Sequence, residues 1–403
     1  MKGEMELNEF DVIVVGAGPA GISAAEKCAE KKLRVLLLEK DQEIGVPKRC
    51  AEGLGLAWFK RLKLKPDKQW AIQPIRGATL YSPSGKKLKI KFSKIAGYVL
   101  ERKMFEKFLA KRAARKGVKI LAKATVKDVI KENGFVKGVK ATVMGEKKTY
   151  YCKIVIAADG IESRIARLSG LNTTNTLFNV DSGFQYEMAG IDFGEEDLIH
   201  LYFGAKVAKR GYVWIFPKGK DCANVGVGIL GSDTKTAKEY LDNFIEATPG
   251  LRKGSIIEVN AGCIPLGGFL EKHTMNGLIV VGDAAHHVNP IHGGGIGIAM
   301  ESGALAAEIC KKAFNKKDFS DETLGEFNSL WYEKRGNQLK NILKRRKMLE
   351  ALSDKDFETL VSSLTGDEIL KVAEGNLLQS AKIISTKLIK NPGLMKLLLK
   401  LLR

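Results

Sequence analysis

The sequence predicts an α/β fold in which a doubly wound domain is interrupted by a β-rich domain and followed by C-terminal helices. Three observations indicate this order. A strand, a glycine-rich turn, a helix and a second strand fill residues 10–39, and alternating strands and turns fill about 172–265. A buried strand with a second glycine-rich loop then follows at 278–296. We therefore expect the first and third segments to belong to one discontinuous domain.

The expected domain boundaries follow these changes of pattern. The ranges are 1–75, 98–171 and 270–315 for the doubly wound domain, 76–97 and 172–269 for the β-rich domain, and 316–403 for the helical C-terminal region.

The composition is that of an ordinary folded protein with a strongly basic charge. The chain has 403 residues, 45% hydrophobic and 28% charged, and a net charge of +20. It lacks an apolar run of transmembrane length, and Met1–Glu9 lacks the regions of a signal peptide, so we expect a cytoplasmic protein. The charge fits an anionic membrane surface, an anionic small molecule or a solvated lysine-rich surface. Nucleic acid is not expected, because no DNA- or RNA-binding motif is present.

The cysteines are scattered along the chain. No two of them form a CxxC pair, so we expect no metal site. They are Cys28, Cys50, Cys152, Cys222, Cys263 and Cys310.

The first glycine-rich turn matches the GxGxxG pattern of a Rossmann-like dinucleotide site. Gly16 makes the tight turn, Gly18 lets the backbone approach a pyrophosphate at the helix N-terminus, and Gly21 lets helix and strand pack closely. Glu39 ends the next strand, where its carboxylate accepts hydrogen bonds from ribose hydroxyls and repels a 2′-phosphate. A dinucleotide other than NADP is therefore expected. The candidates here are Gly16, Ala17, Gly18, Ala20, Gly21, Glu39 and Lys40.

Two later segments specify FAD as the dinucleotide. Ile156–Gly160 ends a buried strand, and Val280–Ile296 places Asp283 at a strand end before a triple glycine and a helix. Asp283 can accept a hydrogen bond from a ribityl hydroxyl, and the helix dipole stabilises negative charge on a reduced flavin ring. The candidates here are Asp159, Gly160, Gly282, Asp283, Pro290, Gly294, Gly295 and Ile296.

A second GxGxxG match occurs at Gly226–Gly231. Its glycines lie inside an alternating strand pattern, and no helix follows directly. We expect a strand of the β-rich domain here, so a second nucleotide domain for NADPH is not indicated.

With these motifs, residues 10–312 resemble the flavoprotein hydroxylase superfamily. The resemblance implies two more contacts with FAD. Arg102 matches the arginine that contacts FAD in that group, and Val126 occupies the strand position that packs near the adenine.

Two further segments resemble the geranylgeranyl reductase family. Val46–Gly53 carries a cysteine, and Gly211–Pro217 matches most of a PxxYxWxFP pattern, with Lys209 in place of its first proline. The resemblance implies an FAD-dependent oxidoreductase acting on CH–CH groups. Archaeal members of the family hydrogenate the geranylgeranyl chains of digeranylgeranylglycerophospholipids, which gives saturated membrane lipids. The implied residues are Cys50, Ala51 and Gly53 for cofactor contacts, Tyr212, Trp214 and Phe216 for substrate contacts, and Cys50, Tyr212 and Trp214 for catalysis.

The residue types suit this chemistry. Tyr212, Trp214 and Phe216 alternate along a strand, so they share one face and make an aromatic wall for a polyprenyl chain. We hypothesise that an alkene carbon is protonated while flavin delivers hydride to the tertiary centre, and that aromatic faces stabilise the transient positive charge. The same aromatics also fit a domain core, and Cys50 also fits a small buried residue. The proton donor stays open, because each of His286, His287 and His292 fits a structural role as well.

Two other classes of function remain alternatives: an NAD(P)H-dependent flavin monooxygenase of a hydrophobic or aromatic substrate, and a membrane-associated electron carrier. A halogenase is disfavoured, because the WxWxIP motif is absent. For a reductase, the electron donor is a ferredoxin, a reduced deazaflavin or NAD(P)H. Leu388–Arg403 has the pattern of a basic amphipathic helix, which suits either peripheral binding to an anionic membrane or docking on the protein itself.

Overall fold

The first domain is built on a parallel sheet with a different layer on each face. The computed structural model describes residues 8–231, 233–366 and 368. In the sheet β1, β2, β8, β12 and β19 run parallel, and β18 is antiparallel at one edge. The strand order is β18-β19-β12-β1-β2-β8, with bounds Thr274–Met275, Leu278–Val280, Ile154–Ala157, Val12–Val15, Val35–Leu38 and Lys119–Leu121.

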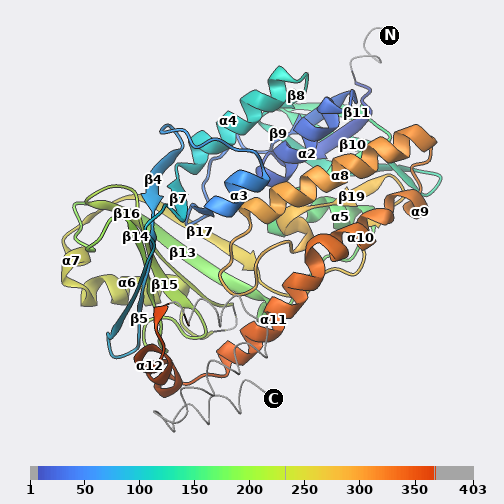
Figure 1. The fold of residues 1–403 in the computed structure, drawn as a ribbon. Helices are drawn as coiled ribbons and strands as arrows, with labels where there is room; N and C mark the ends of the chain where they lie inside the picture. Colours follow the sequence, from blue (N-terminus) through green and yellow to red (C-terminus); the bar gives the residue numbers. More distant parts are fainter. Residues whose placement is uncertain (1–7, 232, 367, 369–403) are drawn as a thin grey trace.

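The two faces of this sheet are buried under different elements (Figure 1). Val12 and Val14 of β1 face a helical layer, whereas Ile13 and Val15 face a three-stranded sheet, because side chains alternate along a strand. The helical layer comprises α2 (Pro19–Glu30), α4 (Arg102–Arg115) and α8 (Ile296–Lys316). The three-stranded sheet comprises β9 (Ala124–Glu132), β10 (Phe135–Val143) and β11 (Glu146–Tyr151).

The β-rich domain is a seven-stranded sheet, and Figure 1 shows it to the left of the first domain. One face packs on α6 (Ala237–Ala247) and α7 (Pro249–Arg252) in a core of its own. The order is β17-β13-β16-β15-β14-β5-β6, with bounds Ser255–Pro265, Val180–Ala189, Cys222–Leu230, Tyr212–Pro217, Leu198–Tyr202, Gly77–Tyr81 and Lys87–Lys91. The second GxGxxG match lies largely within β16, so its prediction as a strand is correct.

Short elements connect the two domains. A small sheet of order β3-β7-β4 (Gly53–Gly55, Gly97–Leu100, Ala71–Ile75) stands beside α3 (Leu56–Arg61). The remaining short helices are α5 (Arg164–Ser169) and the turns η1 (Gly160–Glu162), η2 (Leu177–Asn179) and η3 (Gly282–Ala285).

The C-terminal helices run from the first domain to the β-rich sheet (Figure 1). Arg346 of α11 donates to Asp181 of β13 at 2.8 Å, and Phe357 of α12 stacks on Phe203 with ring centroids 5.7 Å apart. The helices are α9 (Asp321–Leu324), α10 (Glu326–Trp331), a π-helical turn η4 (Tyr332–Gly336), α11 (Asn337–Glu350) and α12 (Asp354–Ser363).

The predicted fold class is confirmed: an interrupted α/β domain, a β-rich domain and C-terminal helices. Within the described part of the chain, no helix is long and apolar enough to cross a membrane. The predicted amphipathic helix at Leu388–Arg403 lies outside the described residues.

Candidate cofactor site and substrate cavity

The first glycine turn is shaped by close backbone contacts on one side and open space on the other. Gly16 has φ +99°, and a Cβ there would lie 2.3 Å from the Ala158 carbonyl oxygen. A Cβ on Gly21 would lie 1.9 Å from the Gly16 carbonyl oxygen. A Cβ on Gly18 would meet nothing within 4 Å, and Gly18 is the N-cap of α2 without a capping side chain. The open N-terminus of α2 therefore offers free amide groups to an anion.

Glu39 fixes the same turn through its carboxylate. Its Oε2 accepts from the Ala17 amide at 2.7 Å, and its Oε1 accepts from the Asp41 amide at 3.0 Å. Lys40 next to it reaches Glu162 at 3.9 Å, and Val126 is buried in β9. The role of Glu39 toward a ribose remains a prediction.

Two half-buried aspartates follow the neighbouring strands β12 and β19. Asp159 Oδ2 accepts from the Ile165 amide at 2.9 Å, whereas its Oδ1 is buried without a partner among the described residues. Burial raises the pKa of Asp159, and also that of Asp283. A Cβ on Gly295, the uncapped N-terminus of α8, would lie 3.3 Å from Asp283 Oδ1. An unpartnered acceptor, an aspartate and two open helix N-termini fit the hydroxyl, phosphate and ring groups of FAD.

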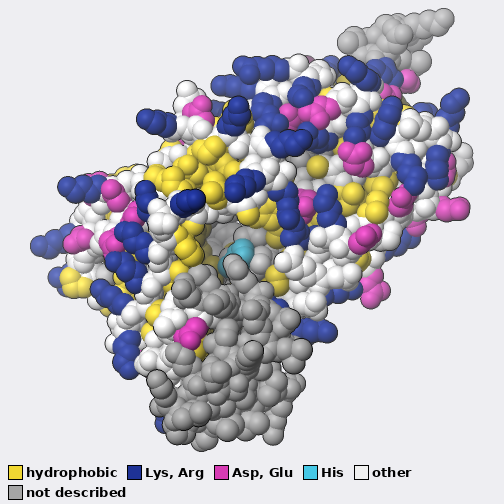
Figure 2. Space-filling model, in the orientation of Figure 1, with side chains coloured by type: hydrophobic (Ala, Val, Ile, Leu, Met, Phe, Trp, Pro, Cys, Tyr) yellow, Lys and Arg dark blue, Asp and Glu magenta, His cyan; other side chains and the backbone are white. Residues whose placement is uncertain are grey.

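A cavity of about 750 Å³ joins these turns to the β-rich sheet. Figure 2 shows the surface hollowed near the centre of one face, with hydrophobic and basic side chains around the hollow. Many of the predicted residues line the cavity: Gly18, Ala20, Cys50, Ala51, Gly53, Arg102, Gly160, Tyr212, Trp214, Phe216, Asp283, Gly294, Gly295 and Ile296. The others lie outside its lining: Gly16, Ala17, Gly21, Glu39, Lys40, Val126, Asp159, Gly282 and Pro290.

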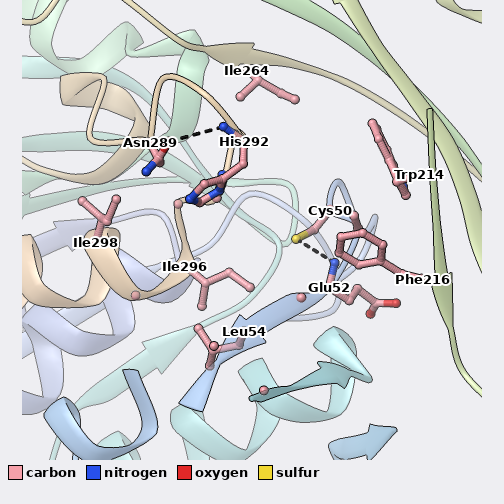
Figure 3. Close-up of a pocket in the computed structure, with 18 of the residues that line it drawn as sticks. Cys50, Glu52, Leu54, Trp214, Phe216, Ile264, Asn289, His292, Ile296 and Ile298 are labelled. Carbon is pink, nitrogen blue, oxygen red and sulfur yellow. Dashed lines mark hydrogen bonds between the residues drawn. The ribbon is translucent and has the colours of Figure 1, made fainter. Parts of the chain in front are cut away.

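The three aromatic residues of β15 stand on the cavity side of the sheet. Trp214 is packed close against β16, since a Cβ on Gly226 would lie 2.4 Å from its ring. The Tyr212 and Trp214 rings meet edge to face at 5.8 Å, and the Tyr212 hydroxyl donates to the His292 carbonyl at 2.8 Å. Phe216 reaches toward Gly53, where a Cβ would lie 2.7 Å from its ring. In Figure 3, Trp214 and Phe216 face the same space as Cys50 and Ile296.

The loop that carries Cys50 is held by side chains of the β-rich sheet. The Glu52 amide donates to Cys50 Sγ at 3.2 Å (Figure 3). Gln185 Nε2 donates to the Cys50 carbonyl at 3.1 Å, and Asn224 Nδ2 donates to the Ala51 carbonyl at 3.3 Å. The Arg102 guanidinium interacts with both Glu106 and Cys50. The thiol therefore lies beside a fixed cation.

A buried ion cluster lies behind this loop. Glu52 is fully buried, and its Oε2 lies 3.3 Å from Lys48 Nζ and 3.1 Å from Lys218 Nζ. Glu187 Oε2 accepts from the same two lysines at 2.6 and 2.8 Å. Burial alone lowers the pKa of each lysine, but the surrounding carboxylates outweigh it and raise both pKa values. The cluster ties the Cys50 loop to the β-rich sheet.

The residues that hold the Cys50 loop were not predicted from the sequence. Glu52 lies within a segment already singled out, so its position beside Cys50 was a usable signal. Gln185 and Asn224 lie in ordinary strands with no motif, and only the folded sheet brings them to the loop.

The structure separates the three histidines of the second glycine-rich loop. His286 and His287 are buried outside the cavity lining, and the His287 ring stacks on Trp331 with centroids 3.8 Å apart. His292 lines the cavity, and its Nδ1 accepts from the Gly294 amide at 3.0 Å. His292 is exposed at the cavity, in contrast to the buried His286 and His287. Of the three, only His292 is placed to exchange a proton with a bound substrate.

These features define an FAD-dependent oxidoreductase. Comparison with known families agrees, since residues 9–184 match an FAD binding domain and residues 179–264 match the geranylgeranyl reductase catalytic domain.

The chain belongs to the geranylgeranyl reductase family. It is 41% identical to digeranylgeranylglycerophospholipid reductase of Methanocaldococcus jannaschii, over 97% of this chain and 98% of the relative. It is 39% identical to digeranylgeranylglycerophospholipid reductase 1 of Methanothermobacter thermautotrophicus, over 96% of this chain and 98% of that relative.

Solved structures agree with this family. A geranylgeranyl bacteriochlorophyll reductase-like protein of Thermoplasma acidophilum superposes with TM-score 0.88 at 35% identity, covering 98% of this chain and 99% of that one. A myxobacterial chondrochloren halogenase superposes with TM-score 0.67 at 21% identity, covering 83% of this chain and 81% of that one. At this identity the likeness concerns the fold alone.

Proposed function

We propose that this protein reduces the carbon–carbon double bonds of geranylgeranyl chains in 2,3-digeranylgeranylglycerophospholipids, giving saturated archaeal membrane lipids. The observation that carries the proposal is the single cavity that joins an FAD-type glycine turn to an aromatic wall. Its other walls are largely aliphatic, with Ile90, Ile199 and Leu201 from the sheet and Leu339 and Ile342 from α11. A polyprenyl chain is the kind of ligand that such a lining favours. The activity named for the relatives is the same.

The addition of two hydrogens to an alkene requires several groups in the cavity, and each has a different role. When bound, reduced FAD supplies the hydride. Trp214 and Phe216 bind the chain and turn aromatic surface toward the carbon where positive charge develops. The cavity walls exclude water from this carbon, because their side chains are mostly apolar.

We assign the accompanying proton to His292, with Cys50 contacting the flavin or the substrate. His292 lines the cavity, and the bond from Gly294 to Nδ1 places the proton of the neutral ring on Nε2, the nitrogen left for the substrate side. This tautomer of His292 is inferred from the hydrogen bond that the Gly294 amide donates to Nδ1.

Peripheral binding to an anionic membrane surface is part of the proposal, because the substrate is a lipid. It is supported by the net charge of +20 and by an exposed apolar side chain at the cavity, Phe92, with Lys94 two residues further on. Sedimentation with vesicles that contain anionic or only zwitterionic lipids tests this part.

The electron donor is proposed as a class: a ferredoxin, a reduced deazaflavin or NAD(P)H. Anaerobic mixing of the holoenzyme with each donor, followed by the loss of flavin absorbance, identifies the donor that reduces the flavin.

The activity is tested without a physiological donor. The holoenzyme is reduced anaerobically with dithionite and mixed with a digeranylgeranylglycerophospholipid, and the lipid is followed by mass spectrometry. A gain of about two mass units per reduced bond, with reoxidation of the flavin, is expected. Unchanged lipid, together with hydroxylation of small aromatics by oxygen and NAD(P)H, would replace the proposal by a monooxygenase.

A further inference from the structure

Two arginines converge on one tryptophan where α3, η4 and α8 meet. The Arg61 and Arg335 guanidinium carbons lie 5.3 and 5.2 Å from the centroid of the Trp58 ring. Trp58 itself packs on α8 at Gly297, where a Cβ would lie 2.1 Å from the ring. Trp58 and Arg335 line the cavity, whereas Arg61 lies outside its lining, on the same ring, with a side chain that is 52% exposed. The ring therefore holds two cations close together beside the cavity.

A single buried carboxylate serves both arginines. Glu301 Oε2 accepts from Arg335 Nε at 2.9 Å, and Glu301 Oε1 lies 3.6 Å from Arg61 Nη1. Arg335 Nη1 also donates to Gln338 Oε1 at 2.7 Å. No hydrogen bond between described residues uses Arg335 Nη2, or Nε or Nη2 of Arg61. The pair thus keeps a positive charge and unused donors.

The other cations of the cavity are engaged elsewhere. Arg102 donates to Glu106 beside the Cys50 loop, and Arg49 donates to Glu162 at 2.9 Å, next to the glycine turns of the cofactor site. The arginine pair instead stands at the start of an apolar path. Gln338, Leu339 and Ile342 continue from Arg335 along the cavity.

We propose that Arg61 and Arg335 bind the phosphate of the lipid headgroup. The adjoining hydrocarbon then runs along Leu339 and Ile342 toward Trp214. This inference rests on the proposed function and adds to it the site that anchors the polar end of the substrate. Guanidinium groups suit the task, because their planar donors match phosphate oxygens and the partial burial of Arg335 strengthens each charge-assisted bond.

The test compares two lipids that differ only in the phosphate: 2,3-digeranylgeranylglyceryl phosphate and 2,3-digeranylgeranylglycerol. The enzyme is the FAD-loaded protein reduced with dithionite, so the electron donor does not enter the measurement. In Arg61→Gln we expect KM for the phosphate lipid to rise about tenfold, with kcat retained and KM for the neutral lipid unchanged.

Arg252→Gln is the matched control. The Arg252 side chain is 53% exposed and lies 3.8 Å from Glu246, whereas the Arg61 side chain is 52% exposed and lies 3.6 Å from Glu301. Arg252 lies on α7, which packs on the core of the β-rich domain, whereas Trp58 packs against the core of the first domain. Its substitution should therefore leave both lipids unaffected.

Arg335 is tested in a double variant that carries both Arg335→Gln and Glu301→Gln. The second substitution is needed because loss of the arginine alone would leave a buried carboxylate unpaired. FAD content and the melting temperature identify any variant that fails to fold, and Arg61→Gln then carries the test. The double variant should raise KM for the phosphate lipid alone.

Three results would overturn the inference. One is an equal change of KM for both lipids, which makes the arginines packing partners of Trp58 only. Another is that inorganic phosphate inhibits the reduction of the two lipids equally. That result would assign the site to free phosphate instead of a lipid headgroup. The third is an Arg61→Gln enzyme identical to wild type. If wild type reduces neither lipid, the proposed function fails by itself. Equilibrium binding of the two lipids, followed through the flavin spectrum, then still tests the phosphate site.

Discussion

The Trp214 indole Nε1 donates to Gln185 Oε1 at 2.9 Å, and the Nε2 of the same amide donates to the Cys50 carbonyl at 3.1 Å. One side chain thus sets the aromatic wall and the cysteine loop relative to each other. Gln185→Leu should lower kcat about tenfold or more while FAD stays bound, because both groups lose their common support. Gln73→Leu is the control, since Gln73 is a half-buried amide of β4 whose Nε2 donates to the Glu196 carbonyl at 2.8 Å. A kcat equal to wild type would contradict this positioning role.

The face of Trp214 should matter more than its N–H group. Trp214→Phe keeps an aromatic ring and loses the bond to Gln185, whereas Trp214→Leu loses both. We expect kcat of Trp214→Leu to lie about 5- to 30-fold below that of Trp214→Phe, since aromatic stabilisation of a cation is worth about 1–2 kcal/mol. Single-turnover flavin reoxidation measures this difference. A change confined to KM would make the wall a binding surface only.

The ion cluster should be costly to break. Glu52→Gln leaves two buried lysines with one fewer carboxylate, and we expect about 3–5 kcal/mol of lost stability in urea unfolding. Glu258→Gln is the matched control. Glu258 lies 3.3 Å from the same Lys48, but its side chain is 44% exposed, so the loss should stay below about 1 kcal/mol. Equal effects of the two substitutions would refute the distinction.

Substitutions of two glycines in the first turn should distinguish an effect on folding from an effect on cofactor binding. Gly16→Ala should destabilise the fold, since its Cβ would lie 2.3 Å from a backbone oxygen at φ +99°. Gly18→Ala should leave the melting temperature of the cofactor-free protein unchanged, since its Cβ meets nothing within 4 Å. It should still weaken FAD binding, because the methyl group occupies space that the pyrophosphate needs. Calorimetry and FAD titration check both outcomes.

Acid should lower the free energy of unfolding, because His273 is protonated more readily in the unfolded chain than in the folded one. Burial lowers the pKa of His273 to about 4, from 6.5 in the unfolded chain. Above pH 6.5 both states are neutral and stability is unaffected. Below it only the unfolded chain gains a proton, so folding loses about 1.4 kcal/mol per pH unit until pH 4 is reached. Urea unfolding at pH 7.5 and 5 should therefore show a smaller loss for His273→Gln than for wild type. Parallel losses would exclude His273 as a source.

Much of the cofactor site could be predicted from the sequence, because its parts are local. A glycine turn between a strand and a helix is shaped by neighbouring residues, so Gly16, Gly18 and Gly21 are recognisable without a fold. The alternation of Tyr212, Trp214 and Phe216 likewise places three rings on one strand face.

Other parts depend on contacts between segments distant in the chain. His286, His287 and His292 look equivalent in sequence, and packing against Trp331 buries one of them while the cavity receives another. Lys48 and Lys218 join Glu52 and Glu187 only because β13 and the end of β15 reach the Cys50 loop.

The sequence by itself determined the interrupted α/β order, the dinucleotide turn and the identity of the aromatic strand, since each arises from periodicity or turn chemistry over a few residues. Only the tertiary structure decided which of these residues share a cavity, which polar groups hold Cys50 in place, and where two arginines meet beside Trp58. Those relationships come from side chains separated by up to about 280 positions in the chain, and sequence spacing carries no information about such distances.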